Sequence, residues 1–346
     1  MRAPRLSRLS IAVIVTAALA VATGFLPARA PAPASGGPLS RFHVGLVFDV
    51  GGRGDKSFND AAWEGISRAG RELGVTTEIL EPSGAEDREA AMRLFAARGF
   101  DLVIGVGFIF STDVNVVAQA FPRTRFACID YAPRPGVPVP ENVAGLVFRE
   151  EEGSFLVGAV AGLLSKSGHV GFVGGMDIPL IHKFEAGYRA GVHEVCPTCV
   201  VHVAYAGTTP DAFRDPVKGK ALAIGEITAG ADVLYHASGT TGHGVFEAAR
   251  DMGAQVIGVD ADQHDEMPGT VVTSMIKRGD VAVFDAIASV TRGEFVGGLR
   301  SFGLAEHGVG YVDEGPHSEG VPPAVKARVA ELAARLVRGE IQVPGR

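Results

Sequence analysis

Residues 43–60 read HVGLVFDVGGRGDKSFND, and this stretch decides the fold class. Its apolar first part is a short run of the kind that forms a buried strand. Glycines within residues 51–54 then allow the tight turn that leads from a strand into a helix. Asp55 or Ser57 can cap a helix that begins near Phe58. The stretch therefore predicts one strand–turn–helix unit of a parallel α/β sheet.

The same alternation of short apolar runs and longer amphipathic runs continues along the chain in two series. Such alternation predicts βαβ units and parallel sheets, and the continuous apolar strands indicate sheets covered on both faces. The first series has predicted strands at His43–Asp49, Thr76–Leu80, Leu102–Val106 and Arg125–Ile129, with helices at Phe58–Leu73, Ala85–Arg98 and Asp113–Ala120. The second has strands at Val170–Val173, Val200–Tyr205, Val233–His236 and Val256–Val259, with helices at Glu151–Ser165, Ile181–Val195, Asp211–Thr228 and Gly244–Met252.

Two such series predict an α/β protein with two doubly wound parallel-sheet lobes. We expect an N-terminal lobe from residues 42–147 plus 273–300, and a C-terminal lobe from residues 148–272 plus 301–346. The chain then crosses between the lobes at hinge segments near 142–148, 271–273 and 301–311. Ligands of open α/β sheets bind beyond the carboxyl ends of the strands, so site residues should follow strands.

Candidate binding residues follow the strands of the first series. Asp49 ends a strand, where its carboxylate could accept hydrogen bonds from a ligand, and Phe58 offers a flat ring at a helix start. Phe108 follows the third strand and is either a second ring of the site or a core residue. Asp113, shortly after it, is either a ligand contact or a helix cap.

The loop after the strand that ends at His236 is also a candidate. Its sequence, SGTTGHG over residues 238–244, exposes backbone N–H groups at a helix start, and Gly239 and Gly242 allow close approach of sugar or phosphate oxygens. His236 and His243 have no third ligand placed with them, so we expect polar histidines and no metal site.

A carboxylate and an ammonium group complete the candidate site. Asp260 follows the next strand, and Lys277 comes seventeen residues later. Together they could supply an acceptor and a donor to vicinal hydroxyls of a sugar, or they could form a salt bridge. The sequence places no nucleophile–base pair and no pair of carboxylates beside a scissile bond, so we expect no catalytic residues, no cofactor and no enzyme.

The N-terminus has the pattern of a secretory signal. Arginines at positions 2, 5 and 8 precede an apolar run over Ile11–Leu26, and the small-residue motif Ala28-Arg29-Ala30 follows. We expect a signal peptide at residues 1–30 and a disordered linker at 31–41. Cleavage nearer Ala34 and an uncleaved membrane anchor are the alternatives, although the run is short for a span of roughly 20 residues.

The three cysteines bear on the redox compartment and on anchoring. None precedes Cys128, so we expect a free periplasmic protein without a lipid-modified cysteine. Cys196 and Cys199 form a C-x-x-C pair that should make a small local disulfide in an oxidising compartment. A redox-active motif and a zinc site are weaker alternatives, because no Trp-Cys context and no second ligand pair accompany it.

Composition and motifs exclude several classes of protein. The formal net charge is −7, with no basic stripe, so a nucleic-acid partner is not expected. The dinucleotide-binding pattern Gly-x-Gly-x-x-Gly is not met, because Ser57 stands where the third glycine would be. No Gly-x-x-x-x-Gly-Lys-Ser/Thr motif occurs, so the chain is not itself a transport ATPase.

Four ordered motifs resemble the basic membrane protein family of substrate-binding lipoproteins, the purine-nucleoside receptor type. The resemblance covers about residues 42–337. The motifs are DKSFN at 55–59 with WEG at 63–65, GVGF at 105–108, KFE-x-GY-x-x-G at 183–191, and GVD-x-DQ at 258–263 with TSM-x-K at 273–277.

This resemblance implies a type I periplasmic binding fold with three hinge crossings. It implies a purine base between Phe58 and Phe184, with Asp49 and Asp113 on the base edge. Asp260, Lys277 and the backbone near Gly239 would hold the ribose, and Asn59 belongs to the first motif. Implied partners are a small-molecule nucleoside and the permease and ATPase subunits of an ABC transporter, with a monomeric binding protein.

Other functions remain open at this point. Some members of the family bind another heterocycle such as riboflavin. The resemblance therefore predicts the architecture more firmly than the identity of the ligand. A sensing module that presents its closed form to a membrane receptor would use the same cleft. A secreted nucleoside hydrolase would need a carboxylate cluster or a metal, and only Asp260 with Asp262 approaches this.

Overall fold

The computed structural model describes residues 42–49, 52–82 and 87–345. The predicted signal peptide at 1–30, the linker at 31–41 and the start of the helix predicted at Ala85 lie outside the described residues. No helix in the described ranges is long and apolar enough to cross a membrane.

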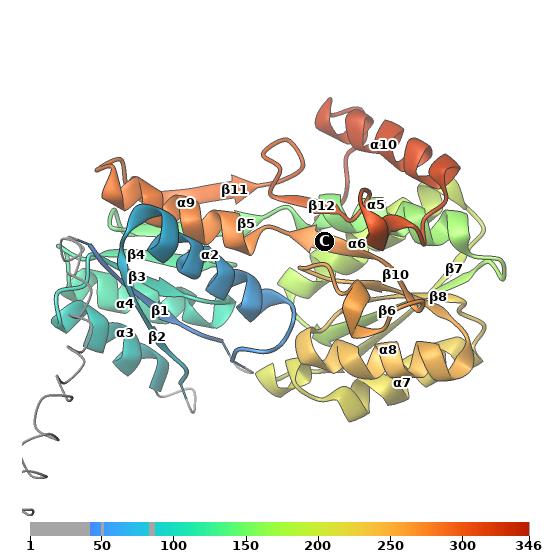
Figure 1. Cartoon of the computed structure of the whole chain (residues 1–346), viewed down its shortest axis with the longest axis horizontal. Coiled ribbons are helices and arrows are strands. Elements are labelled where there is room, and N and C mark those ends of the chain that lie inside the picture. Colours follow the sequence, from blue (N-terminus) through green and yellow to red (C-terminus); the bar gives the residue numbers. More distant parts are fainter. Residues whose placement is uncertain (1–41, 50–51, 83–86, 346) are drawn as a thin grey trace, which may run out of the picture. The chain divides into compact units, whose positions relative to one another are not determined.

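The first sheet has six strands in the order β11-β5-β4-β3-β1-β2, and every neighbouring pair is parallel. The helices that belong to it, α2, α3, α4 and α9, cover it (Figure 1). Its elements are β1 (His43–Val47), α2 (Phe58–Leu73), β2 (Thr76–Leu80), α3 (Asp87–Ala97), β3 (Leu102–Gly105), η1 (Phe108–Phe110), α4 (Ser111–Ala120), β4 (Arg125–Ile129), β5 (Val143–Phe148), α9 (Gly279–Thr291) and β11 (Gly298–Phe302).

The second sheet has the order β12-β10-β9-β8-β6-β7, and only the β10–β12 pair is antiparallel. Its elements are α5 (Glu150–Leu164), β6 (His169–Met176), α6 (Pro179–Val195), β7 (Val200–Gly207), η2 (Pro210–Phe213), α7 (Pro216–Thr228), β8 (Val233–Ala237), η3 (Gly239–Thr241), α8 (Gly242–Met252), β9 (Gln255–Gly258), η4 (His264–Glu266), β10 (Val271–Lys277), β12 (Val309–Tyr311), η5 (Pro316–Ser318) and α10 (Pro323–Val337).

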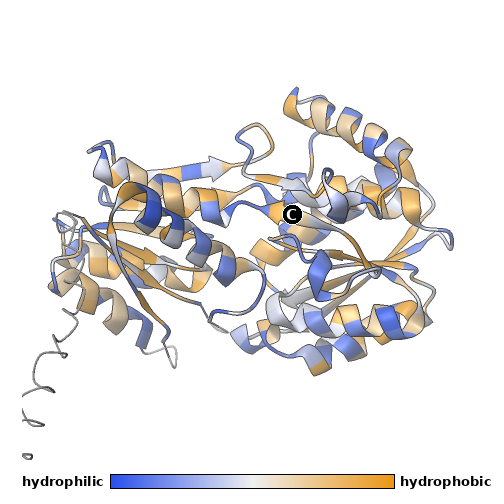
Figure 2. Ribbon diagram, in the orientation of Figure 1, coloured by the Kyte–Doolittle hydropathy of each residue, from blue (hydrophilic) through white to orange (hydrophobic). Residues whose placement is uncertain are grey.

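These sheets confirm the predicted α/β class with two doubly wound lobes. The strands of both sheets consist mainly of apolar residues, while the helices have both apolar and polar faces (Figure 2). The central strands β3, β4 and β8 are buried almost throughout, as expected of sheets covered on both faces.

The chain passes from one sheet to the other at three places. These lie between β5 and α5, between β10 and α9, and between β11 and β12. The crossing strands are tied together, since Arg149 N donates to Phe302 O at 3.0 Å and Arg278 N donates to Gly308 O at 2.8 Å. Strand β10 stays in the second sheet through Lys277, because it pairs with β9 up to Ser274 and with β12 over Met275–Lys277, although the sequence prediction assigns residues 273–277 to the N-terminal lobe.

Several predicted helices begin elsewhere than expected. The helix predicted from Asp113 begins at Ser111, directly after the short helix η1. The helix predicted over Asp211–Thr228 is divided into η2 and α7, because the pair Asp215-Pro216 starts a new helix. The Asp215 side chain accepts the Lys218 N–H at 2.9 Å, which is a standard N-cap contact.

Candidate functional site

A pocket lies at the carboxyl ends of strands from both sheets. In each sheet the strand order reverses between two neighbouring strands, β1 and β3 in the first and β6 and β8 in the second, and such switch points are where open α/β sheets bind ligands. The pocket is lined by Asp49, Asp55, Phe58, Asn59, Gly107, Phe108, Asp130, Leu180, Ile181, Phe184, Phe213, Ala237, Ser238, Gly239, Thr240, Val259, Asp260 and Lys277.

The loop after β1 is organised by the buried carboxylate of Asp55. Its Oδ1 accepts the N–H groups of Ser57 at 3.0 Å and Asp60 at 3.1 Å, and its Oδ2 accepts the N–H of Asn59 at 2.8 Å. These bonds satisfy the first free N–H groups of α2, so Asp55 caps this helix and Ser57 does not. Phe58 is thereby held at the rim of the pocket.

Asn59 connects this helix start to the end of β1. Its Nδ2 donates to Asp55 Oδ2 at 3.1 Å, and its Oδ1 accepts the N–H of Asp49 at 3.2 Å. A Cβ added at Gly107 would lie 2.3 Å from Asp49 Oδ2, and the φ of Gly107 is +103°. Gly107 therefore admits the Asp49 carboxylate to the pocket wall, and Asn59 fixes its backbone.

Lys277, at the end of β10, lies in a cluster of buried charges. Its Nζ donates to Asp130 Oδ2 at 2.7 Å and lies 3.2 Å from Glu150 Oε1. The side chains of Lys277 and Glu150 are 3% and 1% exposed, so the pair is almost fully removed from water. Glu150 in turn accepts from Lys183 Nζ at 2.7 Å. The cluster thus alternates carboxylate and ammonium groups across the crossing segments.

Aromatic rings surround the same ammonium group. Lys277 Nζ lies 5.1 Å from the ring centre of Phe58, 5.0 Å from that of Phe148 and 5.5 Å from that of Phe184. Cations within about 6 Å of a ring face are attracted to it. Lys277 therefore positions Phe58 and Phe184, two rings carried by helices of different lobes, α2 and α6.

Burial shifts the pKa values of these groups. Burial raises the pKa of Asp130 to about 6, although the attraction of Lys277 opposes the rise. Burial lowers the pKa of Lys277, but Asp130, Glu150 and Asp260 outweigh it and hold that pKa above its usual value. Lys277 is therefore cationic at neutral pH.

Asp260 follows β9 and faces the loop after β1. Its Oδ2 accepts the Ser57 hydroxyl at 2.7 Å, although the two residues are 203 positions apart. Burial also raises the pKa of this carboxyl. Ser57 thus links the first lobe to the second at the pocket.

The backbone is strained at the same place. Lys56, Asp130 and Asp260 have φ values of 52°, 56° and 67°, in the left-handed region that residues other than glycine rarely adopt. Asp130 and Asp260 line the pocket, and Lys56 lies in the loop before Phe58. Such strain persists only where the surrounding contacts enforce it, and it is concentrated at binding sites.

His236 is a buried, neutral histidine that supports the pocket from behind. Burial lowers its pKa to about 3. Its Nδ1 lies 3.2 Å from Ser238 Oγ, and its Nε2 lies 3.1 Å from Gln263 Oε1. Gln263 Nε2 donates to Lys56 O at 3.2 Å, so this chain of polar groups also reaches the first lobe.

Most of the predicted site residues meet in this pocket. Those that line it are Asp49, Phe58, Asn59, Phe108, Phe184, Gly239, Asp260 and Lys277. Lys277 lines the pocket and also forms ion pairs with Asp130 and Glu150, whereas the salt bridge considered from the sequence was one with Asp260.

Two predicted residues do not line the pocket. Asp113 forms an ion pair with Arg88 at 3.3 Å, because α4 begins at Ser111 and directs this side chain to α3. Gly242 begins α8 beneath His236, where an added Cβ would lie 2.0 Å from Cε1 of that ring. Gly242 therefore makes room for a supporting residue.

The sequence prediction missed several residues of the lining. Asp130 follows β4 and Phe213 follows β7, so the rule that sites follow strands could have found both. Ser238 and Thr240 lie in the predicted binding loop at residues 238–244, although the prediction names only its glycines. Asp55 is predicted only as a helix cap. Leu180 and Ile181 start a helix and carry no polar signal.

No cysteine lines the pocket, although Cys128 Sγ donates to the O of Gly107, a lining residue, at 3.5 Å. A disulfide joins Cys196 and Cys199 after α6. Cys128 is a free, buried cysteine in β4. Burial raises its pKa, so it has little thiolate character.

Two doubly wound lobes, three crossings and a pocket built from the strand ends of both lobes define a solute-binding protein of the type I periplasmic class. A family model of ABC transporter substrate-binding proteins, described as PnrA-like, matches residues 42–344. The chain belongs to this family, which confirms the resemblance drawn from its motifs.

Individual relatives agree with this assignment. An uncharacterised lipoprotein of Pyrococcus horikoshii is 39% identical over 280 residues, which cover 78% of this chain and 68% of that protein. The ABC transporter nucleoside-binding protein BmpA of Lactococcus lactis is 29% identical over 360 residues, covering 98% and 99%. A crystal structure of ABC transporter solute-binding proteins from Aeropyrum pernix superposes with a TM-score of 0.79 at 32% identity, covering 88% of this chain and 94% of that one.

Proposed function

We propose that this protein binds a purine nucleoside in the pocket between its lobes and delivers it to a membrane permease of an ABC transporter. The observation that carries the proposal is the combination of rings and carboxylates in one lining. Phe58 lies in α2 of the first lobe and Phe184 in α6 of the second, and Asp49 and Asp260 follow strands β1 and β9. A flat base between rings and polar acceptors for its edge and sugar match this combination.

The rings would supply most of the affinity for the base. Stacking of a base on an aromatic side chain contributes about 1–3 kcal/mol. Phe108 and Phe213 add further apolar surface to the lining. This arrangement tolerates any purine, so specificity among bases must come from polar groups.

Asp49 is the acceptor that we assign to the base edge, and Asp260 is the one that we assign to the ribose hydroxyls. Asp113 has no part in the proposal, because it pairs with Arg88 outside the lining. Lys277 keeps Asp130 and Glu150 in place and retains donor capacity toward the ligand, since an ammonium group has three N–H donors. The relative from Lactococcus lactis, named as nucleoside-binding, supports this choice of ligand.

The proposal includes export and a monomeric state. We assign residues 1–30 as the export signal and the periplasm as the location. The lipoprotein name of the Pyrococcus horikoshii relative differs from the unanchored form expected from the position of the first cysteine. Fractionation of cells with and without palmitate labelling separates the two cases, because only a lipoprotein carries label and pellets with membranes.

The decisive experiment identifies the ligand directly. Mass spectrometry of the protein purified under native conditions would reveal a co-purified nucleoside. Calorimetric titration of the emptied protein with inosine, adenosine, guanosine and riboflavin then ranks the candidates. We expect at least one purine nucleoside to bind and to raise the melting temperature. Binding of riboflavin alone, or of none of the four, would contradict the proposal.

A further inference from the structure

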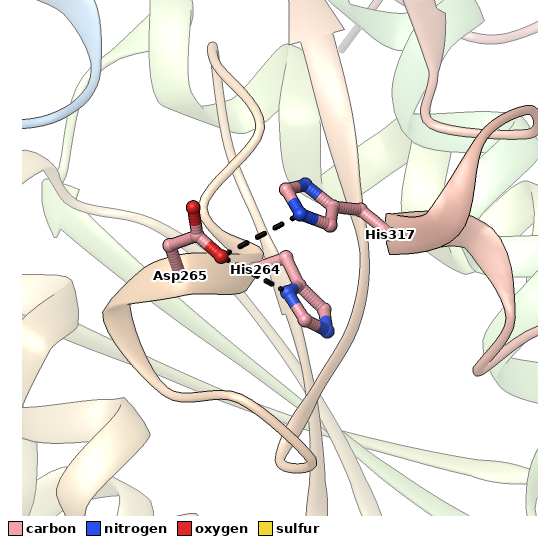
Figure 3. A group of neighbouring side chains, drawn as sticks. All are labelled: His264, Asp265 and His317. Carbon is pink, nitrogen blue, oxygen red and sulfur yellow. Dashed lines mark hydrogen bonds and ion pairs between the residues drawn. The ribbon is translucent and has the colours of Figure 1, made fainter.

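One group of side chains with metal-ligating atoms lies outside the pocket lining. Within the described part of the chain, His264, Asp265 and His317 are the single group of three whose ligand atoms all lie within 4.8 Å of one another. His264 and Asp265 lie in η4, on the connection from β9 to β10, and His317 lies in η5, on the connection from β12 to α10 (Figure 3). Two segments far apart in the sequence thus meet through these side chains.

The separations of Asp265 Oδ1 from the two imidazole nitrogens fit the spacing of ligands around one metal ion. Asp265 Oδ1 lies 3.4 Å from His264 Nδ1 and 3.5 Å from His317 Nε2. Ligand atoms about 2.0–2.1 Å from a tetrahedral ion are separated from one another by roughly 3.3–3.4 Å. Two of the three separations therefore match those around an ion, and the third, between the two imidazole nitrogens, is within 4.8 Å.

A fourth residue orients one of the imidazoles. His317 Nδ1 lies 2.7 Å from Asp262 Oδ2. A carboxylate that accepts the Nδ1–H leaves Nε2 with a free lone pair, and this lone pair faces Asp265. Metal-binding histidines almost always have such a partner on the other ring nitrogen, because it fixes the tautomer and the ring orientation.

We infer that His264, Asp265 and His317 form a binding site for a divalent transition-metal ion, with Zn²⁺ as the ion that suits two imidazoles and one carboxylate best. Asp262 is a positioning residue that holds His317. Three protein ligands leave the fourth position to water, as the side chains are partly exposed. This inference departs from the expectation that the chain has no metal site.

The two rings must adjust when an ion binds. Their centres are 4.3 Å apart and their planes differ by 12°, so the two lone pairs lie in nearly parallel planes and do not converge on one point between the rings. Because Asp262 fixes His317, the His264 ring is the one that turns about its Cβ–Cγ bond. Its side chain is 26% exposed, and its ring nitrogen makes only a long contact of 3.4 Å to Asp265, so this turn costs little.

The bound ion would connect the segment that carries Asp260 and Gln263 to the segment before α10. Both segments belong to the second lobe, so the site strengthens one lobe and does not bridge the two. The inference is independent of the proposed ligand of the pocket, since none of the metal-binding residues lines it.

The test uses the exported protein without a polyhistidine tag, freed of metal with EDTA. Calorimetric titration with Zn²⁺ should show one site of sub-millimolar or better affinity, and Co²⁺ should give the visible absorption of a four-coordinate ion. His317→Ala and the exposed Asp265→Ala should each weaken zinc binding at least about tenfold, and Asp262→Asn by about 10–100-fold. Melting curves without metal establish that each variant folds.

Two control variants locate the site. His182→Ala removes a histidine that pairs with Asp177 at 2.7 Å, and His202→Ala removes half of a histidine pair with His169 at 3.0 Å. Both should retain zinc binding. Failure of the wild-type protein to bind zinc overturns the inference, as does binding that survives His317→Ala and Asp265→Ala or is lost equally in a control.

Discussion

The Nζ of Lys277 and the Oδ2 of Asp130 lie 2.7 Å apart and join the end of a second-lobe strand to the end of a first-lobe strand. Both side chains are almost fully buried. Attraction in such an environment is strong, but so is the cost of removing each charge from water. The net contribution of the pair to the free energy of unfolding is therefore small. Removing one partner is costly, because the other charge would stay buried and unpaired.

Replacing Lys277 with Met should destabilise the protein by about 3–5 kcal/mol, because Asp130 and Glu150 would remain buried without their common partner. Urea unfolding measures the change. Lys220→Met is the matched control, since its pairs with Glu247 and Asp251 are exposed, and it should leave the free energy of unfolding almost unchanged. The double variant K277M/D130N should recover part of the loss, and a fully additive result would contradict the coupling.

The rings of the pocket can be tested by truncation. Phe58→Ala and Phe184→Ala should each weaken nucleoside binding by about 1–3 kcal/mol, because each removes one stacking surface. Isothermal titration measures the effect, and Phe295→Ala, outside the lining, should leave affinity unchanged. Equal affinity in wild type and Phe184→Ala would place the base elsewhere.

Asp260→Asn tests the ribose assignment without adding backbone strain, because Asn tolerates the left-handed conformation that Asp260 adopts at φ 67°. The amide keeps the shape but loses one acceptor. We expect nucleosides to bind about 1–3 kcal/mol more weakly, while free purine bases bind unchanged. The same loss for nucleosides and bases in parallel titrations would refute the assignment.

Glu226 in α7 should make stability depend on pH. Burial raises the pKa of its carboxyl to about 8, although the backbone of Phe172 opposes the rise. The folded state therefore favours the protonated form, so its contribution to stability is fully present below the unfolded pKa near 4.5 and is lost as the pH rises through about 8. The loss should approach about 1.4 kcal/mol per pH unit at most.

Glu226→Gln should remove this dependence and stabilise the protein at pH 8 relative to wild type. Thermal or urea unfolding at pH 5, 6.5 and 8 measures the slope. Glu247→Gln, on the exposed face of α8, is the control and should leave the slope unchanged. A wild-type protein that gains stability between pH 5 and pH 8 through this residue would contradict the sign.

The sequence alone predicts those pocket residues that come directly after a strand. Asp49, Phe108 and Asp260 were found because each follows a strand, and parallel strands direct their carboxyl ends to one edge. Asp113 was misplaced because η1 precedes α4 and the helix starts two residues earlier than its polar pattern suggests. A shift of that size turns a helical side chain by more than half a turn.

Contacts between distant segments were beyond prediction. The bond between Ser57 and Asp260 depends on how two lobes close, and no local pattern records it. The cluster around Lys277 likewise joins four separate segments, and the sequence offered only the choice between a ligand contact and a salt bridge. Asp130 was missed because a proline-rich stretch follows it and no helix signal marked the loop.

The three crossings have a consequence for the order in which the chain can fold. The first sheet is completed by β11, which ends at Phe302, and the second by β12, which ends at Tyr311. Neither sheet can therefore have all of its strands until most of the chain has been synthesised, because the last strand of each sheet lies near the carboxyl end. Non-local pairing of this kind also slows folding. For the export that we propose, both delays would favour a chain that is still unfolded when it reaches the membrane.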